Sequence, residues 1–261
     1  MSRRRNSLIA AVAALALAGC DGASGDAAAT GGAGEQRPKL GLMSSLPLTW
    51  PLGAEVGAIA AGTVETPWQG KALGQDYALV PLDTLAPIPG LSPSDPPTDP
   101  LAGLTRLAVI QPRGLSPRDN VALDDWVRAG GHLLLVLDPV LTGDYDLPLG
   151  DPRRPTEPAL IPPVVKRWGF DITLPEDDSV AGNHRVDALP DGSPVPLAFP
   201  GLVSVTPALA GACLGHGSAG ATCPVGKGRV TLIADAALFE HADIGGEGSP
   251  ALRAVVRAAV E

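Results

Sequence analysis

Two continuous apolar segments enclose a helix in the middle of the chain and constrain the fold most strongly. The segments are Leu107–Ile110 and His132–Leu137. Between them, Ser116 suits a helix N-cap, and Gly130 suits the end of the same helix. A strand, a helix and a strand joined by short links form a βαβ unit, so the two strands should lie parallel and adjacent. Uninterrupted apolar strands predict a sheet that is covered on both faces.

Further strands and helices extend this unit along the chain. The sequence predicts strands at Lys39–Ser45, Tyr77–Leu82 and Gly228–Asp235, and helices at Leu52–Ala61, Leu160–Trp168 and Pro250–Val260. We therefore expect an open, mostly parallel α/β sheet with helices on both faces. A β-rich insertion over 175–227 precedes the last strand.

The N-terminus has the pattern of an export signal. Three arginines, Arg3–Arg5, precede the apolar run Leu8–Leu17, which is shorter than the roughly 20 residues of a membrane span. An ordinary cleaved signal and the start of a membrane helix are the alternatives. Leu17-Ala18-Gly19-Cys20 resembles the bacterial lipobox, which implies cleavage of residues 1–19 and a lipid on Cys20.

The same resemblance predicts the organisation and location of the rest of the chain. Residues 20–38 are rich in glycine, alanine and serine and should form a flexible tether. Residues 39–261 would then form the folded α/β domain. The domain would face the periplasm from the cell envelope and be anchored in the membrane through Cys20. Asp21 resembles a retention signal for the inner membrane rather than the outer.

Charge and cysteine content narrow the possible partners. A net charge of −9 repels phosphate backbones and makes nucleic acid an improbable partner. Cys213 and Cys223 are close in sequence, and in an oxidising compartment such a pair usually forms a disulfide. A zinc site that also used His216 is the alternative, although the spacing matches no common zinc motif. We expect no metal and no cofactor.

Four polar residues follow predicted strands and mark a candidate cleft. They are Ser44, Asp83, Asp138 and Asp235. In open α/β sheets, ligands bind at the carboxyl ends of the strands, so these side chains are expected near one another. Such a cluster could bind a cation or a polyol, or act as acid and base. The alternative for each residue is that it only caps the following turn.

Two adjacent arginines form a second candidate site. Arg153 and Arg154 lie in a proline-bounded loop and could hold an anion or a partner's carboxylate. They could equally pair with nearby acids such as Asp151.

Two segments, Leu107–Pro139 and Gly226–Asp235, resemble the class I glutamine-amidotransferase-like fold. The closer resemblance is to auxiliary domains of uncharacterised ABC-type transport systems, and the loop 150–155 resembles a subset of them. In amidotransferases a nucleophilic cysteine follows the strand that matches His132–Leu137. Asp138 stands at that position, and Pro139 after it has no N–H for an oxyanion hole. The resemblance therefore implies that amidotransferase chemistry is absent.

The function implied by this resemblance is that of a membrane-anchored, non-catalytic accessory or ligand-binding subunit of an ABC-type transport system. Its partners would be the permease or ATPase of that system. Two alternatives stay open. One is a hydrolase that uses the aspartates at the strand ends, and the other is a structural lipoprotein of the envelope.

Overall fold

The computed structural model describes residues 37–148, 150–175, 184–245 and 248–261. The predicted signal, Cys20 and the tether up to residue 36 lie outside these residues. Within the described part of the chain, no helix combines the length and apolarity needed to cross a membrane.

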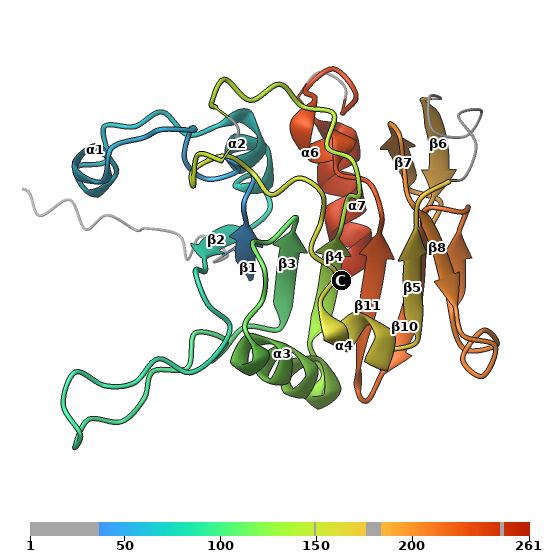
Figure 1. Ribbon diagram of the computed structural model, residues 1–261, viewed down its shortest axis with the longest axis horizontal. Coiled ribbons are helices and arrows are strands. Elements are labelled where there is room, and N and C mark those ends of the chain that lie inside the picture. Colours follow the sequence, from blue (N-terminus) through green and yellow to red (C-terminus); the bar gives the residue numbers. More distant parts are fainter. Residues whose placement is uncertain (1–36, 149, 176–183, 246–247) are drawn as a thin grey trace, which may run out of the picture. The chain divides into compact units, whose positions relative to one another are not determined.

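A seven-stranded sheet forms the centre of the domain, in the order β2-β1-β3-β4-β11-β10-β9 (Figure 1). The strands are β2 (Ala78–Pro81), β1 (Lys39–Ser44), β3 (Arg106–Ile110), β4 (His132–Val136), β11 (Gly228–Ile233), β10 (Gly220–Val225) and β9 (Leu214–His216). The five strands from β2 to β11 are parallel, β10 runs antiparallel to β11, and β9 pairs antiparallel with β10. The predicted α/β class with a mostly parallel sheet is confirmed.

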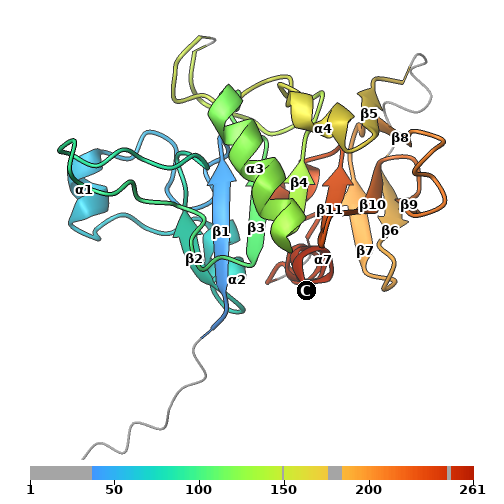
Figure 2. The same ribbon diagram turned by 90° about the horizontal axis from the view of Figure 1, so that it is seen from below.

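Helices cover both faces of the sheet, and each layer buries its own apolar core. Figure 2 shows α3 (Pro117–Ala129) and α4 (Pro163–Arg167) on one face, and α2 (Trp68–Leu73) and α7 (Pro250–Val260) on the other. Alternate residues of β4 enter the two cores: Leu133 and Leu135 pack toward α3, and Leu134 and Val136 toward α7. This explains why the strand is apolar without alternation.

The remaining elements are two short helices and two small antiparallel sheets, and several of their residues enter the two cores. The short helices are α1 (Val56–Ala60) and α6 (Ala237–Glu240). Two small antiparallel sheets pair β5 (Phe170–Thr173) with β8 (Leu202–Val205), and β6 (Arg185–Ala188) with β7 (Pro194–Leu197). The segment around residue 215 adds β9 to the edge of the main sheet.

Asp119 joins the start of α3 to the loop after β2. Ser116 and Asp119 form a reciprocal capping box, and Asp119 Oδ1 also accepts hydrogen bonds from Thr84 Oγ1, Leu85 N and Ala86 N. Burial alone would raise the pKa of Asp119, but these hydrogen bonds hold it well below its ordinary value.

Replacing Asp119 by alanine should therefore lower the free energy of unfolding by about 2–3 kcal/mol near pH 7, because several donors lose their acceptor. A lowered pKa stabilises the fold above about pH 4, so the loss should shrink as the pH falls below that value. Urea unfolding at pH 7 and pH 3 measures both effects. Asp125→Ala, at an exposed position of the same helix, is the control and should change stability by under about 0.5 kcal/mol. Equal losses for the two variants would contradict the prediction.

Candidate functional site

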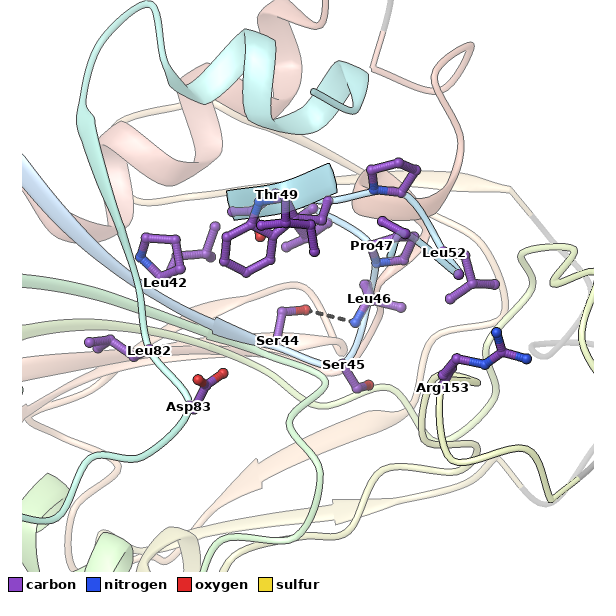
Figure 3. Close-up of a pocket in the computed structure, with 17 residues that line it drawn as sticks. Leu42, Ser44, Ser45, Leu46, Pro47, Thr49, Leu52, Leu82, Asp83 and Arg153 are labelled. Atoms are coloured by element: carbon purple, nitrogen blue, oxygen red, sulfur yellow. Dashed lines mark hydrogen bonds between the residues drawn. The ribbon is translucent and has the colours of Figure 1, made fainter. Parts of the chain in front are cut away.

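A cavity of about 250 Å³ opens at the carboxyl ends of β1 and β2 (Figure 3). We call it the Ser44 cavity. Its walls come from the end of β1, the following segment 46–54, the end of β2 and the loop that carries Arg153. The lining residues with polar side chains are Ser44, Ser45, Thr49, Trp50, Asp83 and Arg153. This is the edge of the sheet at which open α/β folds bind ligands.

Ser44 and Ser45 end the same strand but have different environments. Ser44 Oγ accepts a hydrogen bond from Leu46 N at 2.9 Å, which leaves its hydroxyl proton available to a ligand. Ser45 Oγ instead donates to Gln111 O at 2.5 Å and accepts from Thr156 N at 3.1 Å. Ser44 is therefore the serine that can serve a ligand in this cavity.

Asp83 and Arg153 lie on opposite sides of the Ser44 cavity, with Ser44 and Ser45 between them (Figure 3). Asp83 is exposed and makes no side-chain hydrogen bond within the described residues. Arg153 is held by Asp151 through Nε at 3.0 Å and Nη2 at 2.8 Å. This hydrogen-bonded pairing raises the pKa of Arg153 and leaves its Nη1, on the side of Gly53, without a partner within the described residues.

Asp138 and Asp235 do not line the Ser44 cavity. Their exposed fractions are 0% and 2%. Asp138 accepts hydrogen bonds from Val140 N and Ala236 N, both at 2.8 Å. Asp235 accepts from Ala198 N at 2.7 Å and Ala237 N at 2.8 Å.

The structure therefore separates the four predicted cleft residues into two pairs. Ser44 and Asp83 share a cavity, whereas Asp138 and Asp235 orient the backbone beneath the surface, which is the capping role that the sequence left open. Burial raises the pKa of Asp138 to about 8 and that of Asp235 to about 7, despite the backbone N–H groups that each accepts.

Gln111, which sequence reasoning missed, closes the carboxyl edge of the sheet. It lies between the pair Ser44 and Asp83 and the pair Asp138 and Asp235. From β1 the strands that follow in the chain are added on one side as β2 and on the other side as β3. Open α/β sheets usually bind a ligand at such a change of direction. Gln111 follows β3 and is fully buried. Its Nε2 donates to Asp138 O at 3.0 Å and Thr156 O at 2.8 Å, and its Oε1 accepts from Asp138 N at 2.8 Å. A glutamine after a strand carries no sequence signal for this role.

The two adjacent arginines also differ. Arg154 Nη1 donates to Tyr145 O and Leu147 O, both at 2.7 Å, and Nη2 pairs with Glu157 at 3.2 Å. Arg154 therefore fixes the loop around residue 147, and only Arg153 reaches the Ser44 cavity.

The cysteine pair lies on the opposite edge of the sheet from the Ser44 cavity. Cys213 and Cys223 are joined by a disulfide. His216 Nε2 lies 2.7 Å from Thr222 Oγ1. Among the described residues, no three His, Cys, Asp or Glu side chains are grouped so that they could hold a metal ion.

Comparison with known proteins gives no family model and no curated protein that matches the chain. Among solved structures, the exo-β-1,4-mannosidase Op5Man5 from Opitutaceae bacterium strain TAV5 is 12% identical, with a TM-score of 0.48 over 87% of this chain and 36% of that one. A β-galactosidase from Rahnella sp. R3 is also 12% identical, with a TM-score of 0.41 over 77% of this chain and 29% of that one. A ThuA-like protein from Parabacteroides merdae is 12% identical, with a TM-score of 0.37 over 86% and 90%. The chain thus spans about a third of the two glycosidases.

These matches correct the family prediction. They are glycosidases and a ThuA-like protein, and not auxiliary domains of ABC-type transport systems. The predicted resemblance to such domains is wrong, and so is the predicted role as an accessory subunit of a transport system with a permease or ATPase as partner. The two segments that suggested it, Leu107–Pro139 and Gly226–Asp235, contain parallel strands β4 and β11, whose apolar pattern is general to covered sheets.

Proposed function

We propose that the protein binds a small hydroxy acid or sugar acid in the Ser44 cavity. The observation that carries this proposal is the convergence of Ser44, Asp83 and Arg153 from three segments on one cavity. Asp83 offers carboxylate oxygens to ligand hydroxyls, and Ser44 offers a hydroxyl. The guanidinium of Arg153, on the opposite side, suits a carboxylate. The strand order β2-β1-β3-β4-β11 supports a flavodoxin-like winding of the parallel strands.

Replacing Asp83 by asparagine should weaken binding of gluconate and of glucose by about tenfold, because a charged acceptor of hydroxyl protons is lost. Arg153→Gln should weaken gluconate alone, because glucose has no carboxylate. Ligand-observed NMR with both sugars measures these changes. Asp243→Asn, at another exposed aspartate outside the cavity, is the matched control and should bind both sugars as the parent does. Equal binding by Asp83→Asn and Asp243→Asn, or no binding by the parent chain, would contradict the proposal.

Hydrolysis of the bound ligand is a second candidate function. It is favoured by Asp83, an exposed carboxylate at the wall of a cavity that also presents the Ser44 hydroxyl, because such a carboxylate can serve as an acid or base. Asp138 and Asp235 are buried and do not contribute to this site. Aryl glycosides and aryl esters are suitable probes, and Asp83→Asn should lower any rate by at least about a hundredfold. A rate that is unchanged in this variant would exclude Asp83 as the reacting group.

The location of the protein in the cell envelope rests on residues 1–20 alone and stays a prediction. It is independent of both candidate functions, because the Ser44 cavity lies wholly within the described domain.

A further inference from the structure

A second, larger cavity of about 630 Å³ lies beside the Ser44 cavity. The two share Pro47, Pro51 and Leu52 as a common wall. The other walls of the second cavity come from α2, from the loop 143–145 and from the end of α6. Its volume falls in the range of small-molecule sites. We call it the Trp68 cavity.

One wall of the Trp68 cavity is held rigidly by Glu240 at the end of α6. Glu240 Oε1 accepts hydrogen bonds from Gly143 N at 2.9 Å and Tyr145 Oη at 2.5 Å, and Oε2 accepts from Thr142 N at 3.1 Å. Gly143 lies against this carboxylate, and a Cβ there would overlap with it. The wall that carries Tyr145 is therefore built before any ligand arrives.

The polar groups that line this cavity are predominantly acidic. Glu65, Asp144 and Glu240 contribute carboxylates, and Lys71 is the one basic residue among the lining residues. Lys71 Nζ is paired with Glu65 at 2.6 Å, so these two charges offset each other. The donors to Glu240 are neutral, and its charge is not cancelled. Two negative charges, on Asp144 and Glu240, therefore remain to attract a cation.

Gln69 adds a buried acceptor to the same cavity. Its side chain is 5% exposed, and its Nε2 donates to Phe239 O at 2.8 Å, which fixes the orientation of the amide. Gln69 Oε1 has no hydrogen-bond donor in the described part of the chain. A buried acceptor without a donor is costly, and a hydroxyl or N–H group from a ligand would remove that cost.

The aromatic residues select the kind of cation. Trp68 and Tyr145 both line the cavity, and aromatic rings beside carboxylates suit organic ammonium groups. The guanidinium of Arg154 already lies over the Tyr145 ring, 5.7 Å from its centroid, so Trp68 is the ring that can receive a ligand cation. A metal ion needs several oxygen ligands close together. The described residues contain no group of three His, Cys, Asp or Glu side chains with metal-binding proximity. The negative charges of this cavity therefore lie beside aromatic side chains and not within a set of ligands that could coordinate a metal ion.

We propose that the Trp68 cavity binds a small organic ammonium ion, with the charged nitrogen between Asp144 and the aromatic ring of Trp68. This site is separate from the Ser44 cavity, where Arg153 favours an anion. The test of this proposal is therefore independent of the test of the proposed function.

Choline and its neutral analogue 3,3-dimethylbutanol test the proposal on the full chain, because they have the same shape and differ in charge. Choline should quench tryptophan fluorescence saturably, and the neutral analogue should bind at least about tenfold more weakly. Asp144→Asn should weaken choline binding by about fivefold. Asp146→Asn, two residues along the same loop and outside the cavity, should not weaken it.

Trp68→Leu should weaken choline binding by about tenfold or more, with circular dichroism as the check that the variant is folded. Asp144→Asn does not touch the core and keeps the test valid if Trp68→Leu fails to fold. Equal affinity for choline and its neutral analogue would overturn the proposal and indicate an apolar or sugar site. Absence of choline binding, or equal losses in Asp144→Asn and Asp146→Asn, would overturn it as well.

Discussion

Replacing Gln111 by alanine is expected to lower the free energy of unfolding by about 3 kcal/mol or more. The fully buried amide of Gln111 bonds to both backbone groups of Asp138 and to Thr156 O. Alanine would leave Asp138 N and Thr156 O without partners, although Asp138 O keeps its hydrogen bond from Ala159 N, and it would open a cavity under the loop around residue 156. Denaturant unfolding followed by circular dichroism measures the loss. Gln75→Ala, at an exposed glutamine, should change stability by under about 0.5 kcal/mol.

A second substitution at Gln111 separates the loss of the side-chain hydrogen bonds from the effect of backbone strain. Its φ is 43°, in the left-handed region that alanine tolerates poorly and glycine tolerates well. Gln111→Gly removes the side chain without backbone strain, so its loss reports mainly the hydrogen bonds. We expect Gln111→Gly to remain at least about 2 kcal/mol less stable than the parent. A glycine variant as stable as the parent would show that the side chain contributes little.

The same residue shows where sequence reasoning succeeds and where it ends. Apolar runs in β3 and β4 revealed the sheet, because burial on both faces leaves a continuous pattern. Gln111 directly follows β3 but looks like any polar loop residue. Its role depends on Asp138 and Thr156, which lie 27 and 45 residues farther along the chain. Contacts between residues so far apart in the sequence leave no local pattern from which they could be predicted.

For the candidate sites, too, the sequence identified residue types, and only the fold decides which of these residues reach a cavity. Arg153 and Arg154 are neighbours of the same type, and only the three-dimensional path of their loop sends one to the Ser44 cavity and the other into a backbone contact. Asp83 and Asp138 both follow strands, yet β2 lies at the edge of the sheet and β4 in its middle. An aspartate after an edge strand remains exposed, whereas one after a central strand is covered by neighbouring loops. The Trp68 cavity joins α2 to residues more than 70 positions away, so no spacing rule could have revealed it.

The stability of the protein should fall as the pH rises from about 4 to about 8. Burial raises the pKa of Asp138 to about 8 and that of Asp235 to about 7, from an ordinary value of 3.8. In the unfolded chain both groups ionise near their ordinary value, whereas in the folded chain they hold their protons to higher pH. The unfolded state therefore binds fewer protons over this interval, and the free energy of unfolding decreases.

Each unit of pKa shift corresponds to about 1.4 kcal/mol, so the decrease should be at least about 3 kcal/mol between pH 4.5 and pH 8. Asp76, Asp119 and Asp124 have lowered pKa values, and their stabilising effect is lost only as the pH falls below about 4. They therefore do not mask the trend, whereas His216, whose pKa is lowered by burial, opposes it in part below about pH 6.5. Urea unfolding at half-unit steps from pH 4.5 to pH 8.5 measures it.

Asp138→Asn identifies the responsible group. Its amide N–H₂ would face either Val140 N or Ala236 N, so the variant should be less stable than the parent at pH 5. Because asparagine does not titrate, its stability should also depend less on pH than that of the parent. Asp83→Asn, at an exposed position, should keep the parent's pH profile. A parent stability that is constant or rises between pH 5 and pH 8 would show that Asp138 and Asp235 are ionised in the folded chain. The two backbone N–H groups at each carboxylate would then outweigh its burial.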